Sequence, residues 1–146
     1  MRHNAVSRRV SLSTLSQLQT VLDRLSAVYD TPNVTLDETT RSCSLAFDDQ
    51  QEILIIQPNQ SDKVYIASPV ADLSDSNRDE YYEKALKFNF LGIVTNGAVF
   101  SIDDTAEQML LSVSTKVESL DEHALAELLA EFIGTLKSDL LNSYLN

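Results

Sequence analysis

DEYYEKALKFNFLGIVTNGAVFSIDD, residues 79–104, is followed by AEQMLLSVSTKVESL at 106–120 and DEHALAELLAEFIGTLKSDLLNSYL at 121–145. Apolar residues recur at helical spacing in the first and last segments, and short apolar runs separated by Asn96-Gly97 and Asp103-Asp104 lie between them. This pattern predicts a helix, a pair of strands and a long closing helix. Ser119 with Glu122 three residues later is the expected cap of that closing helix.

Working outward, the preceding residues predict three short strands, SCSLAF (42–47), EILIIQ (52–57) and KVYIAS (63–68), with Pro69 closing the third. Before them, a helix should begin near Ser11 or Ser13 and end at about Tyr29. Residues 1–10 are expected to be a flexible N-terminal extension, and residues 11–146 a single domain of ordinary size.

The resulting order, α-β-β-β-α-β-β-α, predicts an α+β fold. The strands should form one mainly antiparallel, twisted sheet that packs against the helices.

The charge of the chain limits its partners. The net charge is −11, whereas residues 1–41 alone carry five arginines against four acidic residues. An acidic protein disfavours nucleic acid and anionic membrane surfaces as partners, because both carry negative charge. The single cysteine excludes an internal disulfide, no apolar run approaches the roughly 20 residues of a membrane span, and no signal peptide is evident. These features favour a cytoplasmic protein.

The predicted first helix is apolar over an unusually wide arc. At about 100° per residue, its apolar side chains cover roughly 200°, against about 100° for a helix on a single core. Two interpretations remain: the helix contacts a partner as well as its own core, or its own domain covers it on both sides. The residues concerned are Leu12, Leu15, Leu18, Val21, Leu22, Leu25, Val28 and Tyr29.

The sequence offers little catalytic chemistry. Its two histidines, His3 and His123, lie in the N-terminal extension and near a helix start, and Cys43 lies in a predicted strand. Aspartate pairs such as Asp103-Asp104 fall in predicted turns. We therefore expect no catalytic, metal or cofactor site and no enzymatic activity, with a small hydrolase using Cys43 or a turn carboxylate as the weaker alternative.

The run from Ala85 to Ile133 resembles the class I type III secretion chaperones, the Tir-chaperone-like family. The resemblance lies in a Leu-x-x-Asn-like step at LKFNF (86–90), a strand after glycine at GAVFSI (97–102) and a closing amphipathic helix after ESLD (118–121) with Phe132 on its apolar face. Together with the order of elements, it covers about residues 11–145.

This resemblance implies a bacterial cytoplasmic homodimer without enzymatic activity. Such a chaperone binds the N-terminal segment of a secreted effector, keeps it soluble and secretion-competent, and delivers it to the secretion apparatus, with the secretion ATPase as a further partner. Recognition would combine strand addition with docking into apolar grooves. The alternative is a non-enzymatic α+β adaptor or sensor that binds a folded protein.

Two sets of candidate residues follow. The resemblance implies a dimer interface on the second helix and the strand after it, at Tyr81, Tyr82, Leu86, Phe88, Val99, Phe100 and Ile102. The effector groove is expected on the first helix and the nearby sheet, at Leu15, Leu18, Leu22, Leu45 and Phe47.

Overall fold

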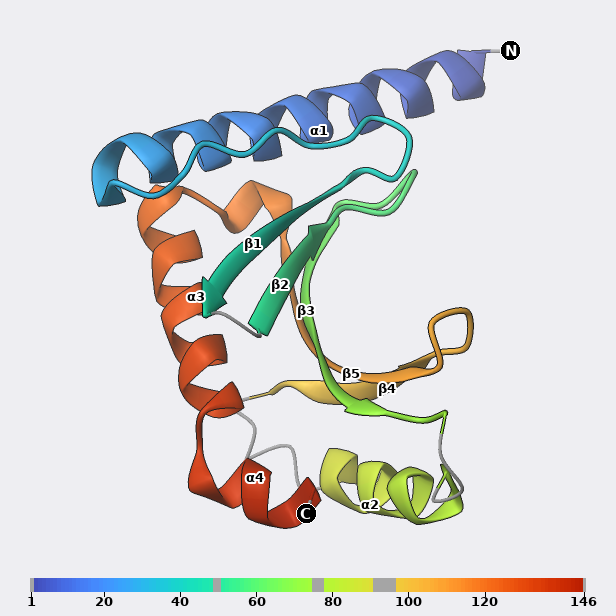
Figure 1. Cartoon of the computed structure of the whole chain (residues 1–146). Coiled ribbons are helices and arrows are strands. Elements are labelled where there is room, and N and C mark those ends of the chain that lie inside the picture. Colours follow the sequence, from blue (N-terminus) through green and yellow to red (C-terminus); the bar gives the residue numbers. More distant parts are fainter. Residues whose placement is uncertain (1, 49–50, 75–77, 91–96, 146) are drawn as a thin grey trace. The chain divides into compact units, whose positions relative to one another are not determined.

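The computed structural model describes residues 2–48, 51–74, 78–90 and 97–145 (Figure 1). Helices and strands follow the predicted order, which confirms the α+β fold. Their bounds are α1 (Arg2–Tyr29), β1 (Ser42–Asp48), β2 (Gln51–Ile56), β3 (Lys63–Asp72), α2 (Arg78–Phe90), β4 (Val99–Asp103), β5 (Gln108–Lys116), the 3₁₀ helix η1 (Val117–Ser119), α3 (Glu122–Leu136) and α4 (Asp139–Leu145).

The five strands form one sheet in the order β1-β2-β3-β5-β4. β4 and β5 pair antiparallel from Val99 opposite Ser112 to Asp103 opposite Gln108. In this register Phe100 lies opposite the fully buried Leu111. β1 and β4 are therefore the terminal strands among the described part of the sheet.

The chain divides into two compact units, which are described separately. The first contains residues 1–45, 54–66 and 114–128, and the second contains residues 46–53, 67–113 and 129–146.

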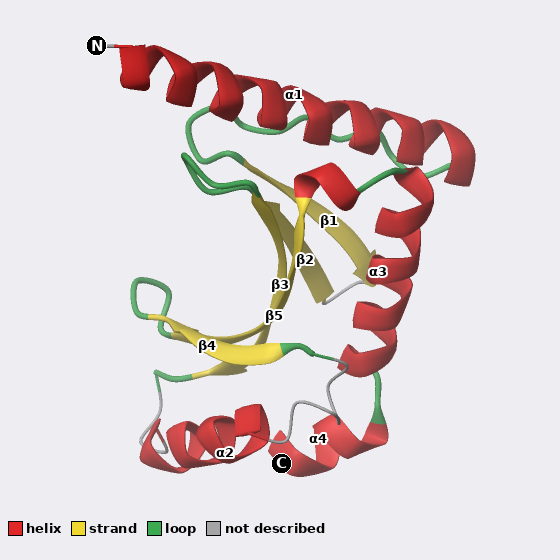
Figure 2. Ribbon diagram, turned by 180° about the vertical axis from the view of Figure 1, so that it is seen from behind, coloured by secondary structure: helices red, strands yellow, loops and turns green. Residues whose placement is uncertain are grey.

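In the first unit, α1 supplies much of the core. Its buried side chains recur at helical spacing and include Leu18, Val21, Leu22 and Leu25. The segment after α1 runs back along the helix (Figures 1 and 2). Gln19 holds it there, because its amide nitrogen donates to the Val34 carbonyl at 3.0 Å and its amide oxygen accepts from the Leu36 N–H at 2.9 Å.

The two ends of α1 differ in how well they were predicted. The helix ends at Tyr29 as expected, and Asp30 adopts the left-handed conformation (φ 53°) that commonly follows a helix. Its start was predicted wrongly, because the helix begins at Arg2 rather than near Ser11 or Ser13. The flexibility of residues 1–10 stays a prediction.

β3 continues past the proline that was expected to end it. Pro69 lies within the strand, which extends to Asp72. Proline has no N–H to donate, and side-chain hydrogen bonds to β2 form beside it instead. The Ser68 hydroxyl donates to the Glu52 carbonyl at 2.7 Å, and the Gln51 amide donates to the Pro69 carbonyl at 3.1 Å. Gln51 also contacts the Ser68 hydroxyl. The strand thus tolerates a residue that usually ends one.

The closing helix is two helices. Asp121, and not Ser119, caps α3, because its carboxylate accepts from the Ala124 N–H at 2.7 Å. Ser119 instead lies in η1. α3 ends at Leu136, and the Ser138 hydroxyl accepts from the Leu141 N–H at 3.2 Å, which makes Ser138 the cap of α4.

Candidate functional site

Large apolar side chains are exposed on α2 and β4, in the second unit. Phe90 is 89% exposed and Leu86 73%, and Val99 and Ile102 on β4 are each more than 40% exposed. We call these four residues the α2–β4 apolar set. Single exposed apolar residues are normal on a protein surface, but an almost fully exposed phenylalanine marks a position where a partner would gain by covering it.

Helical geometry explains why α2 exposes these residues. The helix packs on β4 (Figures 1 and 2) through the buried Phe88, whose ring meets that of Phe100 edge to face at 5.1 Å between centroids. Leu86 and Phe90 are each two residues from Phe88, so at 100° per residue they project from the opposite side of the helix. They are also one turn apart and therefore share a face.

Asn89 bonds α2 directly to the backbone of β4. Its amide oxygen accepts from the Phe100 N–H at 2.7 Å, and its amide nitrogen donates to the Phe100 carbonyl at 3.1 Å. At the start of the helix, the Arg78 guanidinium donates to the Leu73 carbonyl at 2.6 Å and pairs with the Glu107 carboxylate at 2.9 Å. Both ends of α2 are thus fixed within the second unit.

Polar residues on α2 also follow helical spacing. Lys84 pairs with Glu80 at 3.6 Å, and Lys87 pairs with Glu83 at 2.9 Å. The hydrogen bond from Lys87 and its charge lower the pKa of the Glu83 carboxyl. Ion pairs near the surface, such as these, contribute little to stability.

The structure divides the predicted dimer residues into surface and core. Leu86, Val99 and Ile102 are exposed, and Tyr81 and Tyr82 are half-buried. Phe88 and Phe100 are core residues, 3% and 6% exposed. The set of predicted dimer residues omitted Phe90, although its spacing of one turn from Leu86 would have identified it.

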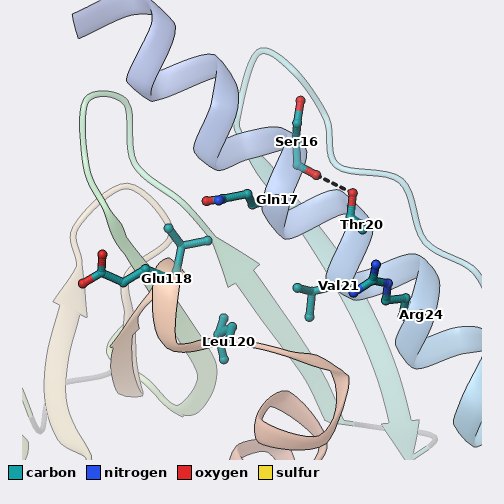
Figure 3. A pocket seen from close by; sticks show the side chains of 8 residues that line it. Ser16, Gln17, Thr20, Val21, Arg24, Glu118 and Leu120 are labelled. Carbon is teal, nitrogen blue, oxygen red and sulfur yellow. Dashed lines mark hydrogen bonds between the residues drawn. The ribbon is translucent and has the colours of Figure 1, made fainter.

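In the first unit, a cavity of about 370 Å³ opens between α1 and η1 (Figure 3). We call it the α1–η1 groove. Ligand sites in proteins commonly start at about 300 Å³. The groove is lined by Ser16, Gln17, Thr20, Val21, Arg24, Val117, Glu118 and Leu120.

The α1–η1 groove has an apolar centre and charged ends. Val21 is buried and Leu120 half-buried, and Figure 3 shows both between Arg24 at one end and Glu118 at the other. Thr20 donates its hydroxyl hydrogen to the Ser16 carbonyl at 2.9 Å. Arg24 and Glu118 are both exposed side chains, available to groups of opposite charge.

The predicted effector-contacting residues have different surroundings. Leu18 and Leu22 are 0% and 1% exposed, so they belong to the core that supports α1. Leu15 and Leu45 are half-buried and keep some accessible surface. The side chain of Phe47 lies outside the described residues.

The residues considered for catalysis are buried or form hydrogen bonds within the fold where the structure describes them. Burial raises the pKa of the Cys43 thiol to about 11, so the thiolate that a nucleophile requires is disfavoured. The His123 Nδ1 lies 2.9 Å from the Tyr29 hydroxyl. Asp103 accepts the N–H groups of Thr105 and Ala106, as a turn residue does. The side chain of His3 lies outside the described part of the chain.

The described residues contain no group of three or more histidine, cysteine or acidic side chains placed to hold a metal ion. Nor do they contain a helix with the length and apolar character that crossing a bilayer requires.

Comparison with known proteins gives a family match. The sequence model of the Tir chaperone protein (CesT) family matches residues 20–138. No curated protein matches the sequence.

Solved structures share the fold at low sequence identity. One in the HopA1-SchA chaperone-effector complex is 15% identical with a TM-score of 0.67, covering 86% of this chain and 94% of the other. A chain of the ExsC-ExsE complex is 16% identical with a TM-score of 0.69, and the match covers 84% of this chain and 90% of the other. A third similar structure is the complex of the Yersinia pestis type III secretion chaperone SycH with a fragment of YscM2. Its matching chain is 12% identical with a TM-score of 0.58, and the match covers 81% of this chain and 95% of the other.

Proposed function

Because the chain belongs to the Tir chaperone protein (CesT) family, we propose that it is a type III secretion chaperone. It binds the N-terminal segment of a secreted effector, keeps that segment soluble and secretion-competent, and delivers it to the secretion apparatus. The family match over residues 20–138 carries this proposal. The similar folds in a chaperone-effector complex and in the SycH complex support it.

The α1–η1 groove is the first proposed contact for this client segment. Its centre at Val21 and Leu120 suits an apolar client side chain, and Arg24 and Glu118 suit flanking charges of opposite sign. Leu15 lies half-buried on the same helix, one turn before Gln19. Leu18 and Leu22, the other predicted contacts on α1, are buried in the free chain and support the helix from the core.

The second proposed contact is strand addition at β1. The Arg41 carbonyl accepts from the Gln57 N–H at 3.0 Å and so points toward β2, whereas the Ser42 carbonyl accepts from the Asp37 N–H at 2.9 Å. Because backbone groups alternate along a strand, the Ala46 N–H points away from β2. An extended client segment beside β1 would bond to that edge and cover part of Leu45.

The chain is proposed to act as a homodimer through the α2–β4 apolar set. Burying a large apolar side chain contributes about 1.5–3 kcal/mol, and in a dimer each copy supplies the same residues. This gain has to outweigh the repulsion between two copies that each carry a net charge of −11. The half-buried Tyr81 and Tyr82 would lie at the margin of the interface.

The proposed chaperone acts without catalysis, in the bacterial cytoplasm. The raised pKa of Cys43 agrees with a packing role for that residue. The secretion ATPase is a further proposed partner, through which the loaded chaperone reaches the secretion apparatus.

Co-expression tests the proposed function. The chain is expressed together with secreted proteins encoded near it, purified by a tag on the chain, and treated with protease at low concentration. The proposal predicts that one secreted protein co-purifies and that its N-terminal segment resists the protease only in the complex. A partner that is folded on its own and gains no protection would indicate the adaptor or sensor instead.

A further inference from the structure

The described sheet ends at β4, and terminal strands normally accept additional strands. Such an edge presents unpaired N–H and C=O groups to any extended chain nearby. Natural proteins therefore cover or interrupt their edges. In this chain the β4 edge is covered at Phe100 by a side chain of α2.

Asn89 makes the two bonds that a neighbouring strand would make. The Phe100 N–H donates to the Asn89 amide oxygen at 2.7 Å, and the Phe100 carbonyl accepts from the Asn89 amide nitrogen at 3.1 Å. Two paired antiparallel residues exchange the same pair of bonds. A primary amide can replace a strand residue in this way because it carries one acceptor and two donors.

The geometry of β4 places these groups on its outer edge. Backbone groups alternate in direction along an antiparallel strand. Since Phe100 uses both of its groups on Asn89, Val99 and Ser101 are the residues that face their partners on β5, Ser112 and Leu110. Phe88, one residue before Asn89, packs its ring on that of Phe100 and so holds α2 against the strand.

We propose that Asn89 closes the β4 edge to strand addition. An incoming strand would have to displace α2 to reach the Phe100 backbone. A second copy therefore meets α2 and β4 through the exposed side chains of the α2–β4 apolar set and does not extend the sheet. The same closure directs a client segment to β1, a consequence that rests on the proposed function.

Hydrogen exchange and mass measurement test the proposal on the purified chain without a client. In the wild type, the Phe100 amide should exchange slowly. Asn89→Ala should accelerate its exchange about tenfold, as expected for the loss of one hydrogen bond, and should produce assemblies larger than those of the wild type by light scattering. Asn142→Ala, which removes an exposed amide from α4, is the matched control and should change neither result.

Asn89→Asp separates the two bonds and serves if Asn89→Ala fails to fold. The carboxylate still accepts from the Phe100 N–H but donates nothing to its carbonyl. Phe100 should then remain protected. Rapid exchange of Phe100 in the wild type, or unchanged exchange and unchanged mass in Asn89→Ala, would overturn the proposal. Because these measurements use the chain alone, they are independent of whether it binds an effector.

Discussion

Leu86 and Phe90 lie one helical turn apart on α2 and have the two highest exposures among the large apolar side chains described, 73% and 89%. Phe88, between them in sequence, is 3% exposed and packs on Phe100. The face of α2 that carries Phe88 thus packs into the core of its own unit. The opposite face, with Leu86 and Phe90, is apolar but lies outside that core. This division underlies the predictions for α2.

The first prediction concerns association. Leu86→Asp and Phe90→Asp should each convert the dimer to a monomer, because each copy loses about 1.5–3 kcal/mol of apolar burial and gains a charge at the interface. Light scattering over a range of protein concentrations measures the change. Val28→Asp introduces the same charge at an exposed position on α1 and should leave the mass unchanged. A dimer that persists in both α2 variants would contradict the proposed interface.

The second prediction compares two phenylalanines for stability. Phe88→Ala should lower the free energy of unfolding by about 3–5 kcal/mol, because it leaves a cavity against Phe100. Phe90→Ala should change it by less than about 0.5 kcal/mol, since its ring is exposed. Urea denaturation in the Leu86→Asp background removes any effect of dimer dissociation. Equal losses for the two variants would show that both rings are buried.

The third prediction concerns the α1–η1 groove. Leu120→Asp should weaken binding of the co-purifying client segment at least about tenfold, because it places a charge where an apolar side chain is expected to dock. Isothermal titration calorimetry with that segment measures the affinity. Ser119→Asp adds the same charge at an exposed neighbour that does not line the groove, and should bind like the wild type. If both variants keep full affinity, the client binds elsewhere.

The fourth prediction concerns the edge of β1. Ala46→Pro removes an N–H that points away from β2, so the fold should persist, as edge strands tolerate proline. Client affinity should fall, because that N–H would bond to the added strand. Ala46→Val keeps the N–H and should retain affinity. Circular dichroism checks the fold and calorimetry the affinity; wild-type binding by the proline variant would exclude strand addition at this residue.

Periodicity predicted the elements well because spacing is a local property. The alternation of apolar and polar residues at 42–47 corresponds to β1, and the helical spacing of apolar residues around residue 88 corresponds to α2. Non-local hydrogen bonds account for an important error. Pro69 continues β3 because two side chains link it to β2: Gln51 of β2 donates to the Pro69 carbonyl, and Ser68 of β3 donates to the Glu52 carbonyl. The sequence near Pro69 does not reveal these partners on β2.

The helix boundaries show the same limit. Ser119 and Asp121 are both suitable caps, and only the geometry of η1 decides that Asp121 bonds to α3. At the break between α3 and α4, the Ser138 hydroxyl caps α4 by accepting from the Leu141 N–H. The apolar pattern of residues 121–145 runs through this break and does not indicate it.

The candidate site was harder to predict, because an apolar pattern does not distinguish a core face from a partner face. The wide arc of α1 included Leu18 and Leu22, which the core covers, and Val28 and Tyr29, which remain exposed. On α2, Phe90 has the greatest exposure, yet its place in the helical pattern does not distinguish it from a core residue. Tertiary packing decides which apolar residues remain available.

Hydrogen exchange on a co-purifying secreted protein, free and bound to this chain and followed by mass spectrometry, tests the proposed chaperone function most directly. The chaperone function predicts that the N-terminal segment of that protein exchanges rapidly when free and becomes protected in the complex, while its remaining residues exchange alike in both states. Protection confined to a folded domain of the partner, with the N-terminal segment still exchanging rapidly, would contradict it.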